Sequence, residues 1–239
     1  MKVFVSDSYD EMSKVAAEKA VELLFRIANP LVCIASGDTP TGMYRNFVKM
    51  KNSSDSNIAN WNFIALDEWV GMNQNDEGSC GNYLFRTLLE PMNKNKDEYT
   101  MFDGKAQDLQ NECTRVLSFI SKKGGKIDLA ILGLGVNGHL GLNEPGTSDH
   151  HLAHVSQLSD STKSVGQKYF SSGKELTQGI TLGLATLMNA KTVFLIVNGA
   201  HKKAILNEVI NGEISKQIPG TILQKHPNCF IFTDRSAAS

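Results

Sequence analysis

The sequence predicts an α/β protein with a doubly wound, mostly parallel sheet and helices on both faces of that sheet. Short apolar runs, each as long as a buried strand, alternate from end to end with longer amphipathic segments. Parallel strands need connections of that length, usually a helix that packs against the sheet. The 239 residues contain no internal repeat, low-complexity tract or linker, so we expect a single domain over residues 1–239.

The expected strands are apolar runs bounded by polar or glycine-containing loops. They span residues 2–5, 31–35, 62–66, 127–132, 155–158, 192–197 and 229–233. The expected helices carry apolar residues at helical spacing, as positions 12, 15, 16, 20, 23, 24 and 27 do in the first helix. They span residues 10–29, 83–91, 107–122 and 201–210 and the segment that ends near residue 50, with a further element over 179–189. This succession is typical of a Rossmann-like sheet.

Composition is that of an ordinary soluble globular protein. The net charge is −1 and 41% of the residues are hydrophobic, which favours neither a nucleic acid nor a membrane surface as partner. The four cysteines form no CxxC pair, as is usual for reduced intracellular proteins. No secretory signal and no run as long as a membrane span is visible, so we expect a cytoplasmic protein. A homo-oligomer is compatible with the sequence, which does not determine the number of subunits.

The loop Ser36-Gly-Asp-Thr-Pro40-Thr-Gly lies between an expected buried strand and an expected helix. Backbone N–H groups in such a turn and at a helix N-terminus bind anions, and Ser36 and Thr39 can add hydroxyl donors around Gly37. The alternative is an ordinary turn in which a threonine caps the helix. Both interpretations stay open at this stage, because the loop is not a Walker motif.

Two adjacent acids, Asp67 and Glu68, follow the strand over residues 62–66. Successive side chains of a strand point to opposite faces, so one acid should face the crevice at the sheet edge and the other should point away. A carboxylate in the crevice could remove a carbon-bound proton beside a carbonyl. A helix cap or a salt bridge is the structural alternative.

The glycine-rich loop over residues 133–146 holds Asn137, His139 and Glu144 within eight positions. It follows a buried strand, and open α/β sheets bind ligands beyond the carboxyl ends of their strands. A carboxylate near an imidazole orients it and favours its charged form, which makes an acid–base pair. The surrounding glycines let the backbone pass close to a ligand. A solvated histidine is the alternative.

Two further groups of polar residues are weaker candidates. The cluster His150-His151-Leu-Ala-His154 lacks the spacing of a known zinc motif, so we expect no metal site. Lys202 begins a helix after the strand over residues 192–197 and could meet a phosphate as a point charge. An exposed helix lysine is the alternative for Lys202.

Taken together, these motifs resemble the glucosamine-6-phosphate isomerase/deaminase family along nearly the whole chain, most closely its galactosamine-6-phosphate branch. The motifs are Ser36-Gly-Asp-Thr-Pro40, Leu66-Asp-Glu-Trp-Val-Gly71, Gly135-Val-Asn-Gly-His139, Leu142-Asn-Glu-Pro-Gly146, Ile180-Thr-Leu-Gly183 and Gly199-Ala-His-Lys202. The resemblance implies deamination of a hexosamine 6-phosphate: preferably galactosamine 6-phosphate, giving tagatose 6-phosphate, and otherwise glucosamine 6-phosphate, giving fructose 6-phosphate. Neither a metal nor an organic cofactor would be required.

The resemblance also assigns roles. Asp67 would move the proton from C2 to C1, and His139 would move the proton in ring opening with Glu144 orienting it. Many relatives carry Asp where this chain has Asn137, and an amide can only hydrogen-bond. Lys202 would bind the phosphate, whereas Lys168 matches only loosely an arginine that does so in the family, and it lacks the bidentate fork.

Two rival functions follow from the same motifs. A 6-phosphogluconolactonase usually reads Asp-Gly-His-Thr-Ala-Ser in the central loop, which the segment over residues 140–145 does not match. A sugar-phosphate-sensing domain would need the phosphate loop but not Asp67, His139 and Glu144 together. Residues 147–158 also lack the basic cluster with which regulated relatives bind an activator, and the chain ends earlier, at residue 239, so we expect no such activation.

Overall fold

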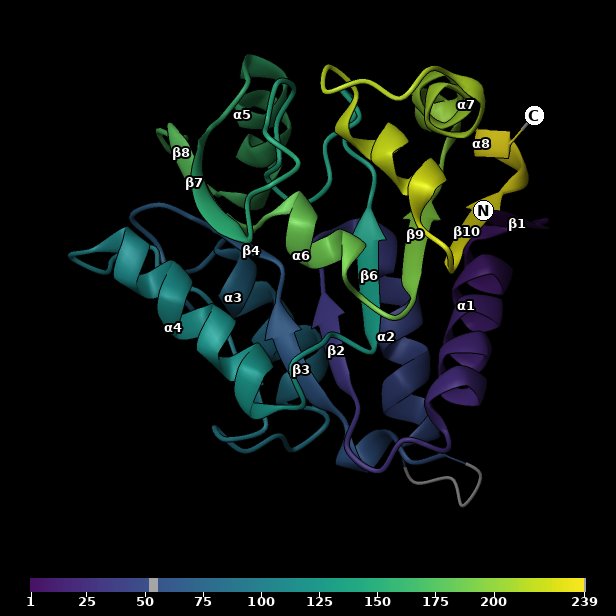
Figure 1. Ribbon diagram of the computed structural model, residues 1–239, viewed down its shortest axis with the longest axis horizontal. Coiled ribbons are helices and arrows are strands. Elements are labelled where there is room, and N and C mark those ends of the chain that lie inside the picture. The colour runs from purple at the N-terminus through teal and green to yellow at the C-terminus, as the bar shows by residue number, and fades with distance from the viewer. Residues whose placement is uncertain (52–55, 239) are drawn as a thin grey trace.

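A parallel sheet of seven strands forms the centre of the computed structural model, which describes residues 1–51 and 56–238 (Figure 1). The strand order is β1-β10-β9-β6-β2-β3-β5, and every neighbouring pair is parallel. The bounds are β1 (Lys2–Ser6), β2 (Leu31–Ile34), β3 (Asn62–Ala65), β5 (Tyr99–Thr100), β6 (Leu129–Gly133), β9 (Val193–Val197) and β10 (Cys229–Asp234). The predicted mostly parallel α/β fold is confirmed.

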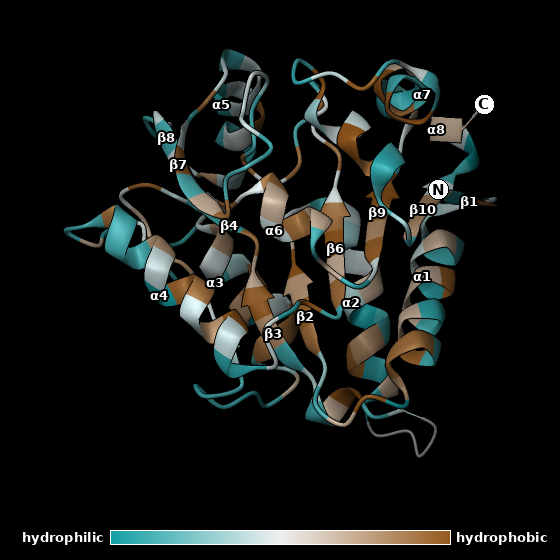
Figure 2. Cartoon of the chain, viewed as in Figure 1, coloured by the Kyte–Doolittle hydropathy of each residue, from teal (hydrophilic) through white to brown (hydrophobic). Residues whose placement is uncertain are grey.

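Helices cover both faces of this sheet, because its strands bury side chains on both sides. On β6, Leu129 and Ile131 pack toward α1 (Tyr9–Leu24) and α2 (Asp38–Met50). The alternate residues of β6 pack toward the helices on the other face. These helices are α4 (Leu109–Lys122), α6 (Leu184–Met188) and α7 (Lys203–Asn211). Figure 2 shows the result as hydrophobic strands between helices with a hydrophilic outer side.

The remaining elements are short. They comprise α3 (Cys80–Leu84), which continues into the π-helical turn η2 (Phe85–Leu89), α5 (Asp160–Gly166), α8 (Arg235–Ala238), and the 3-10 turns η1 (Ile58–Asn60), η3 (Gln167–Tyr169), η4 (Ala200–Lys202) and η5 (Pro219–Lys225). Within the described residues, no helix combines the length and the apolar character needed to cross a membrane.

A second sheet has the order β4-β8-β7 and is antiparallel; the predicted strand over residues 155–158 overlaps its β7, but the sheet itself was not predicted. Its strands are β4 (Asp67–Trp69), β7 (Ala153–Gln157) and β8 (Gln178–Leu182). The expected element over residues 179–189 is therefore divided between β8 and α6. The chain switches sheets at Leu66, whose N–H donates to Ile34 of the central sheet and whose carbonyl accepts from Leu182. This switch aims the residues after β3 into the site.

The first helix ends at Leu24, five residues earlier than the sequence predicts. The side-chain amide of Asn57 donates to the carbonyls of Leu24, Phe25 and Ile27. These are carbonyls that a continuing helix would bond internally. The distant asparagine thus satisfies the helix end, and no local signal in the sequence reveals it.

Candidate active site

A cavity of about 650 Å³ lies where the loops after β2, β3, β6 and β9 meet. The register brings these loops together, since Ile34 pairs with Ala65 and Ile131, and Gly133 pairs with Ile196. Carboxyl ends of adjacent parallel strands form the ligand crevice of open α/β sheets. Seven of the predicted site residues line the cavity: Ser36, Gly37, Thr39, Asp67, His139, Lys168 and Lys202. Asn137 and Glu144 lie behind His139.

The Ser36 loop leads directly into α2, and Gly37 occupies the N-cap with φ of 107°. No side chain caps the helix there, so its first N–H groups face the cavity end of the loop without a side-chain acceptor. A Cβ at position 37 would lie 3.0 Å from the hydroxyl oxygen of Tyr169, which packs over the turn. Thr39 donates to the Asn198 side chain rather than capping, at 2.9 Å. The loop therefore has the geometry of an anion site.

Two lysines reach the same side of the cavity. Lys202 donates to the carbonyl of Leu134 at 2.6 Å, and burial together with the charge of Lys168 lowers its pKa to about 8. Lys168, from η3, forms a 2.7 Å ion pair with Asp38 in the first turn of α2. The ammonium of Lys168 also lies 4.9 Å from the ring centroid of Tyr169.

Asp67 and Glu68 point in opposite directions, as strand alternation predicts. Asp67 lines the cavity with 8% of its surface exposed, and burial raises its pKa to about 6 although His139 and the Cys80 thiol favour its charged form. Glu68 is fully buried and accepts N–H groups from Trp69, Cys80 and Gly81 at 2.8, 3.0 and 2.8 Å. The helix-end role that the sequence left open thus belongs to Glu68.

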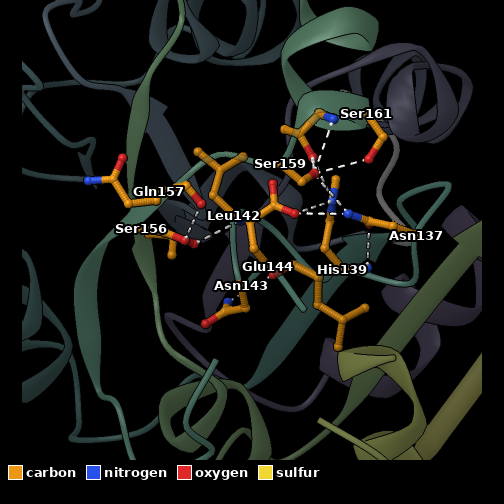
Figure 3. Close-up of polar contacts among 12 residues, drawn as sticks. Asn137, His139, Leu142, Asn143, Glu144, Ser156, Gln157, Ser159 and Ser161 are labelled. Atoms are coloured by element: carbon orange, nitrogen blue, oxygen red, sulfur yellow. Dashed lines mark hydrogen bonds and ion pairs between the residues drawn. The ribbon is translucent and has the colours of Figure 1, made fainter. Parts of the chain in front are cut away.

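Asn137, His139 and Glu144 form one group, and Figure 3 shows their side chains turned toward one another. The imidazole Nδ1 lies 3.7 Å from Glu144 Oε2, and the Asn137 amide donates to the same oxygen at 2.9 Å. The side-chain oxygen Oδ1 of Asn137 accepts a hydrogen bond from the backbone N–H of His139 at 3.2 Å. Burial opposes ionisation of Glu144, but the neighbouring His139, Thr162 and Asn137 side chains lower its pKa to about 2. Glu144 is therefore a carboxylate at neutral pH.

The absence of a side chain at Gly135 leaves room for the imidazole of His139. A Cβ at position 135 would lie 2.5 Å from both Cδ2 and Nε2 of His139, so any larger residue would displace the ring. Gly135 and His139 both line the cavity, so the imidazole packs against the backbone of Gly135 at the cavity wall. Close approach of backbone and ring explains at least this glycine of the central loop.

Several cavity residues have no counterpart among the sequence candidates: Trp69, Cys80, Thr162, Tyr169 and Asn198. The Cys80 thiol lowers the pKa of Asp67, and Thr162 Oγ1 lies 3.1 Å from His139 Nδ1, so both residues lie beside the candidate acid–base groups. For Thr162 one signal was available, because Ser159 precedes it by three positions as a helix N-cap. That signal locates a helix start but not a neighbour of His139.

The histidine cluster lies outside the cavity. The rings of His151 and His154 stack with centroids 4.6 Å apart, and His154 Nε2 lies 2.9 Å from the Asn143 side-chain oxygen. Over residues 1–51 and 56–238, no three His, Cys, Asp or Glu side chains are grouped so as to hold a metal. Burial and the charge of His151 lower the pKa of His154.

Comparison with known proteins gives the class. Residues 6–231 match the family described as glucosamine-6-phosphate isomerases/6-phosphogluconolactonase. The chain is 35% identical to a glucosamine-6-phosphate deaminase of Thermoanaerobacter pseudethanolicus, with 100% of this chain and 94% of that protein covered. It is 34% identical to the one of Oceanobacillus iheyensis, with 99% and 95% covered.

Solved structures agree. A monomeric glucosamine-6-phosphate deaminase matches with a TM-score of 0.94 at 29% identity, covering 100% of this chain and 99% of that one. A 6-phosphogluconolactonase from Trypanosoma brucei matches with a TM-score of 0.74 at 19% identity, covering 99% and 97%, which shows a shared fold. The chain belongs to the glucosamine-6-phosphate isomerase/6-phosphogluconolactonase family, as its motifs predict. It is an enzyme of that family.

Proposed function

We propose that this enzyme converts a hexosamine 6-phosphate into a ketose 6-phosphate and ammonia. The observation that carries the proposal is the arrangement of the cavity, in which Asp67 and the His139–Glu144 pair are separate acid–base groups beside an anion loop with two lysines. An amino-sugar isomerisation needs these parts: a base for a carbon-bound proton, a second group for ring opening, and a remote anchor. The names of the relatives support the same reaction.

Asp67 is the base in this proposal. The ring-opened amino aldose loses its C2 proton to the carboxylate while its aldehyde oxygen takes up a proton, which gives the enolamine. The same proton then returns to C1 and leaves a ketose imine, and water adds to the imine carbon and releases ammonia. A pKa of about 6 suits this task, because the carboxylate is ionised at neutral pH and yet retains affinity for a proton.

His139 moves the proton in ring opening. The anomeric hydroxyl must lose a proton and the ring oxygen must gain one, and one imidazole can do both in turn. Glu144, held as a carboxylate, stabilises the imidazolium that forms between these steps. Asn137 cannot titrate, so it supports the pair through hydrogen bonds alone.

The phosphate would bind at the N-terminus of α2, with Ser36, Gly37 and Thr39 in the loop and Lys202 and Lys168 as cations. Binding energy from this remote group can be used to orient C1 and C2 against Asp67. To bind the phosphate, the Lys168 ammonium must either leave its ion pair with Asp38 or contact Asp38 and the phosphate together.

The second part of the proposal concerns which epimer of the hexosamine 6-phosphate is the substrate. The motif resemblance favours galactosamine 6-phosphate, whereas the curated relatives compared above are glucosamine-6-phosphate deaminases. Ammonia release from both sugars, with Asp67→Asn as control and 6-phosphogluconolactone as a third substrate, tests activity and epimer together. We expect ammonia from at least one hexosamine 6-phosphate and none from the variant. Turnover of the lactone alone, or binding without ammonia release, would refute the proposal.

A further inference from the structure

The nearest polar side-chain atom to His139 Nδ1 is the hydroxyl of Thr162, not the carboxylate of Glu144. Thr162 Oγ1 lies 3.1 Å from Nδ1, whereas Glu144 Oε2 lies 3.7 Å away. Thr162 belongs to α5, which comes from a different part of the chain than the central loop, and it is 4% exposed. It is also one of the side chains that lower the pKa of Glu144, so its hydroxyl lies near the carboxylate as well as the imidazole.

The hydrogens of this network can be assigned by starting from Asn137. Its amide nitrogen donates to Glu144 Oε2 at 2.9 Å and to Ser159 Oγ at 3.0 Å, which uses both of its N–H bonds. Ser159 Oγ also accepts the backbone N–H of Thr162 at 3.3 Å, so both of its lone pairs are occupied. Ser159 must therefore donate its single hydrogen, which goes to Thr162 Oγ1 at 3.1 Å, with Ser161 Oγ at 3.0 Å able to share it.

These hydrogen bonds also bear on which ring nitrogen of His139 carries the hydrogen. Thr162 Oγ1 receives the Ser159 hydrogen and lies 3.1 Å from His139 Nδ1. Glu144 Oε2, which can only accept, lies 3.7 Å from the same nitrogen. With a hydrogen on Nδ1, both oxygens can accept from the imidazole. The opposite tautomer would bring an unprotonated Nδ1 to 3.7 Å from a carboxylate oxygen, where two lone-pair-bearing atoms repel each other.

We propose that Thr162 is a positioning residue that holds His139 with its hydrogen on Nδ1, so that Nε2 is the nitrogen that exchanges a proton with the substrate. His139 lines the cavity with its Nδ1 turned toward Thr162 and Glu144, so Nε2 is the ring nitrogen left without a protein partner among these contacts. The chemical use of Nε2 rests on the proposed function, but the tautomer is a property of the protein alone.

Asn137 has a defined part in this proposal. Its two N–H bonds give the network its direction, from Asn137 through Ser159 to Thr162 and Glu144. A carboxylate at position 137 could donate to neither Ser159 nor Glu144. The amide therefore sets the direction of the hydrogen bonds even though it cannot titrate.

Long-range proton–nitrogen NMR spectra of protein labelled with ¹⁵N-histidine test the tautomer without substrate. For neutral His139 in the parent protein, we expect an Nδ1 bearing hydrogen and an unprotonated Nε2. In Thr162→Val, which keeps the shape and loses the hydroxyl, the Nδ1–H signal should give way to a mixture of tautomers. Thr162→Ser should restore the parent pattern. Thr186→Val is the matched control, because it also removes a buried hydroxyl, one that donates to Leu152 away from the cavity.

Kinetics supply a second readout. Thr162→Val should lower kcat roughly ten- to a hundredfold, as the loss of groups that orient an imidazole commonly does, with KM within about twofold. An Nε2–H tautomer in the parent protein would overturn the proposal outright, even if the valine variant did not fold. An unchanged tautomer in Thr162→Val, or no recovery in Thr162→Ser, would overturn it too. Inactivity toward every hexosamine 6-phosphate would instead refute the proposed function and leave the tautomer result standing.

Discussion

Asp67 and Glu68 are neighbours on β4, yet their carboxylates lie on opposite sides of the strand and in different surroundings. Asp67 faces the cavity, where burial raises its pKa to about 6, and Glu68 is enclosed by three backbone N–H groups. Two of those N–H groups begin α3, so Glu68 ties β4 to the helix that also carries Cys80. One carboxylate is thus available for chemistry and the other holds it in position.

Asp67→Asn should stabilise the fold while abolishing activity. Because the folded-state pKa is raised, the native protein binds a proton that the unfolded chain has lost, and wild-type stability falls as pH rises from about 4 to about 6. A shift from 3.8 to about 6 corresponds to about 3 kcal/mol, an upper bound. Thermal unfolding at a series of pH values should therefore show that the melting temperature of the variant rises relative to that of the parent across that pH range. Exchange of the C2 hydrogen with solvent should disappear, and exchange at the parent rate would place the base elsewhere.

Glu68→Gln should destabilise the protein. The glutamine amide presents hydrogens to N–H groups that need an acceptor, and an unsatisfied buried donor costs about 1–3 kcal/mol. The chemical-denaturation midpoint should fall and kcat should fall with it, since Asp67 and Cys80 both depend on the same anchor. Glu90→Gln makes the same substitution at an exposed position and serves as the control. Equal stability in the two variants would contradict the anchoring role.

Phosphate binding should weaken above pH 8. Only the charged form of Lys202 attracts an anion, and burial and the charge of Lys168 lower the pKa of this lysine to about 8. The inhibition constant of inorganic phosphate, measured from pH 6 to 10, should rise as pH passes that value. Lys202→Arg should move the rise to higher pH because the guanidinium does not deprotonate in this range. Lys203→Arg, at the adjacent exposed position, should leave the profile unchanged.

Asp38→Asn should tighten phosphate binding through Lys168. The ion pair between these residues is largely exposed, with 48% and 69% of the side chains accessible, and pairs of this kind contribute about 0.2–1 kcal/mol. Releasing Lys168 should therefore lower the inhibition constant of inorganic phosphate roughly two- to fivefold.

A double-mutant cycle separates this effect from a general charge effect. If Asp38 acts by occupying Lys168, the gain should vanish in a Lys168→Met background. A gain of equal size in that background would mean that only the negative charge near α2 matters. Asp160→Asn is the matched control, because it also removes an exposed carboxylate that pairs with a lysine, Lys163.

Local patterns were sufficient for much of this protein. Alternating apolar runs and amphipathic segments predict the parallel sheet, because burial on both faces leaves a periodic trace in each segment. They also place Ser36, Asp67, His139 and Lys202 after strand ends, and parallel packing then brings such loops to one edge. Strand alternation further predicts that Asp67 and Glu68 diverge.

Tertiary packing decided what no single segment encodes. The β4-β8-β7 sheet arises only because three distant segments pair, and α1 ends at Leu24 because Asn57 reaches its carbonyls. By sequence, Thr162 is a polar residue outside every predicted element, and only the position of α5 brings its hydroxyl to 3.1 Å from His139 Nδ1. Periodicity reports whether a residue is buried, whereas its partners depend on which elements meet in space. The acid–base group of the central loop is therefore completed by a helix that the loop itself does not predict.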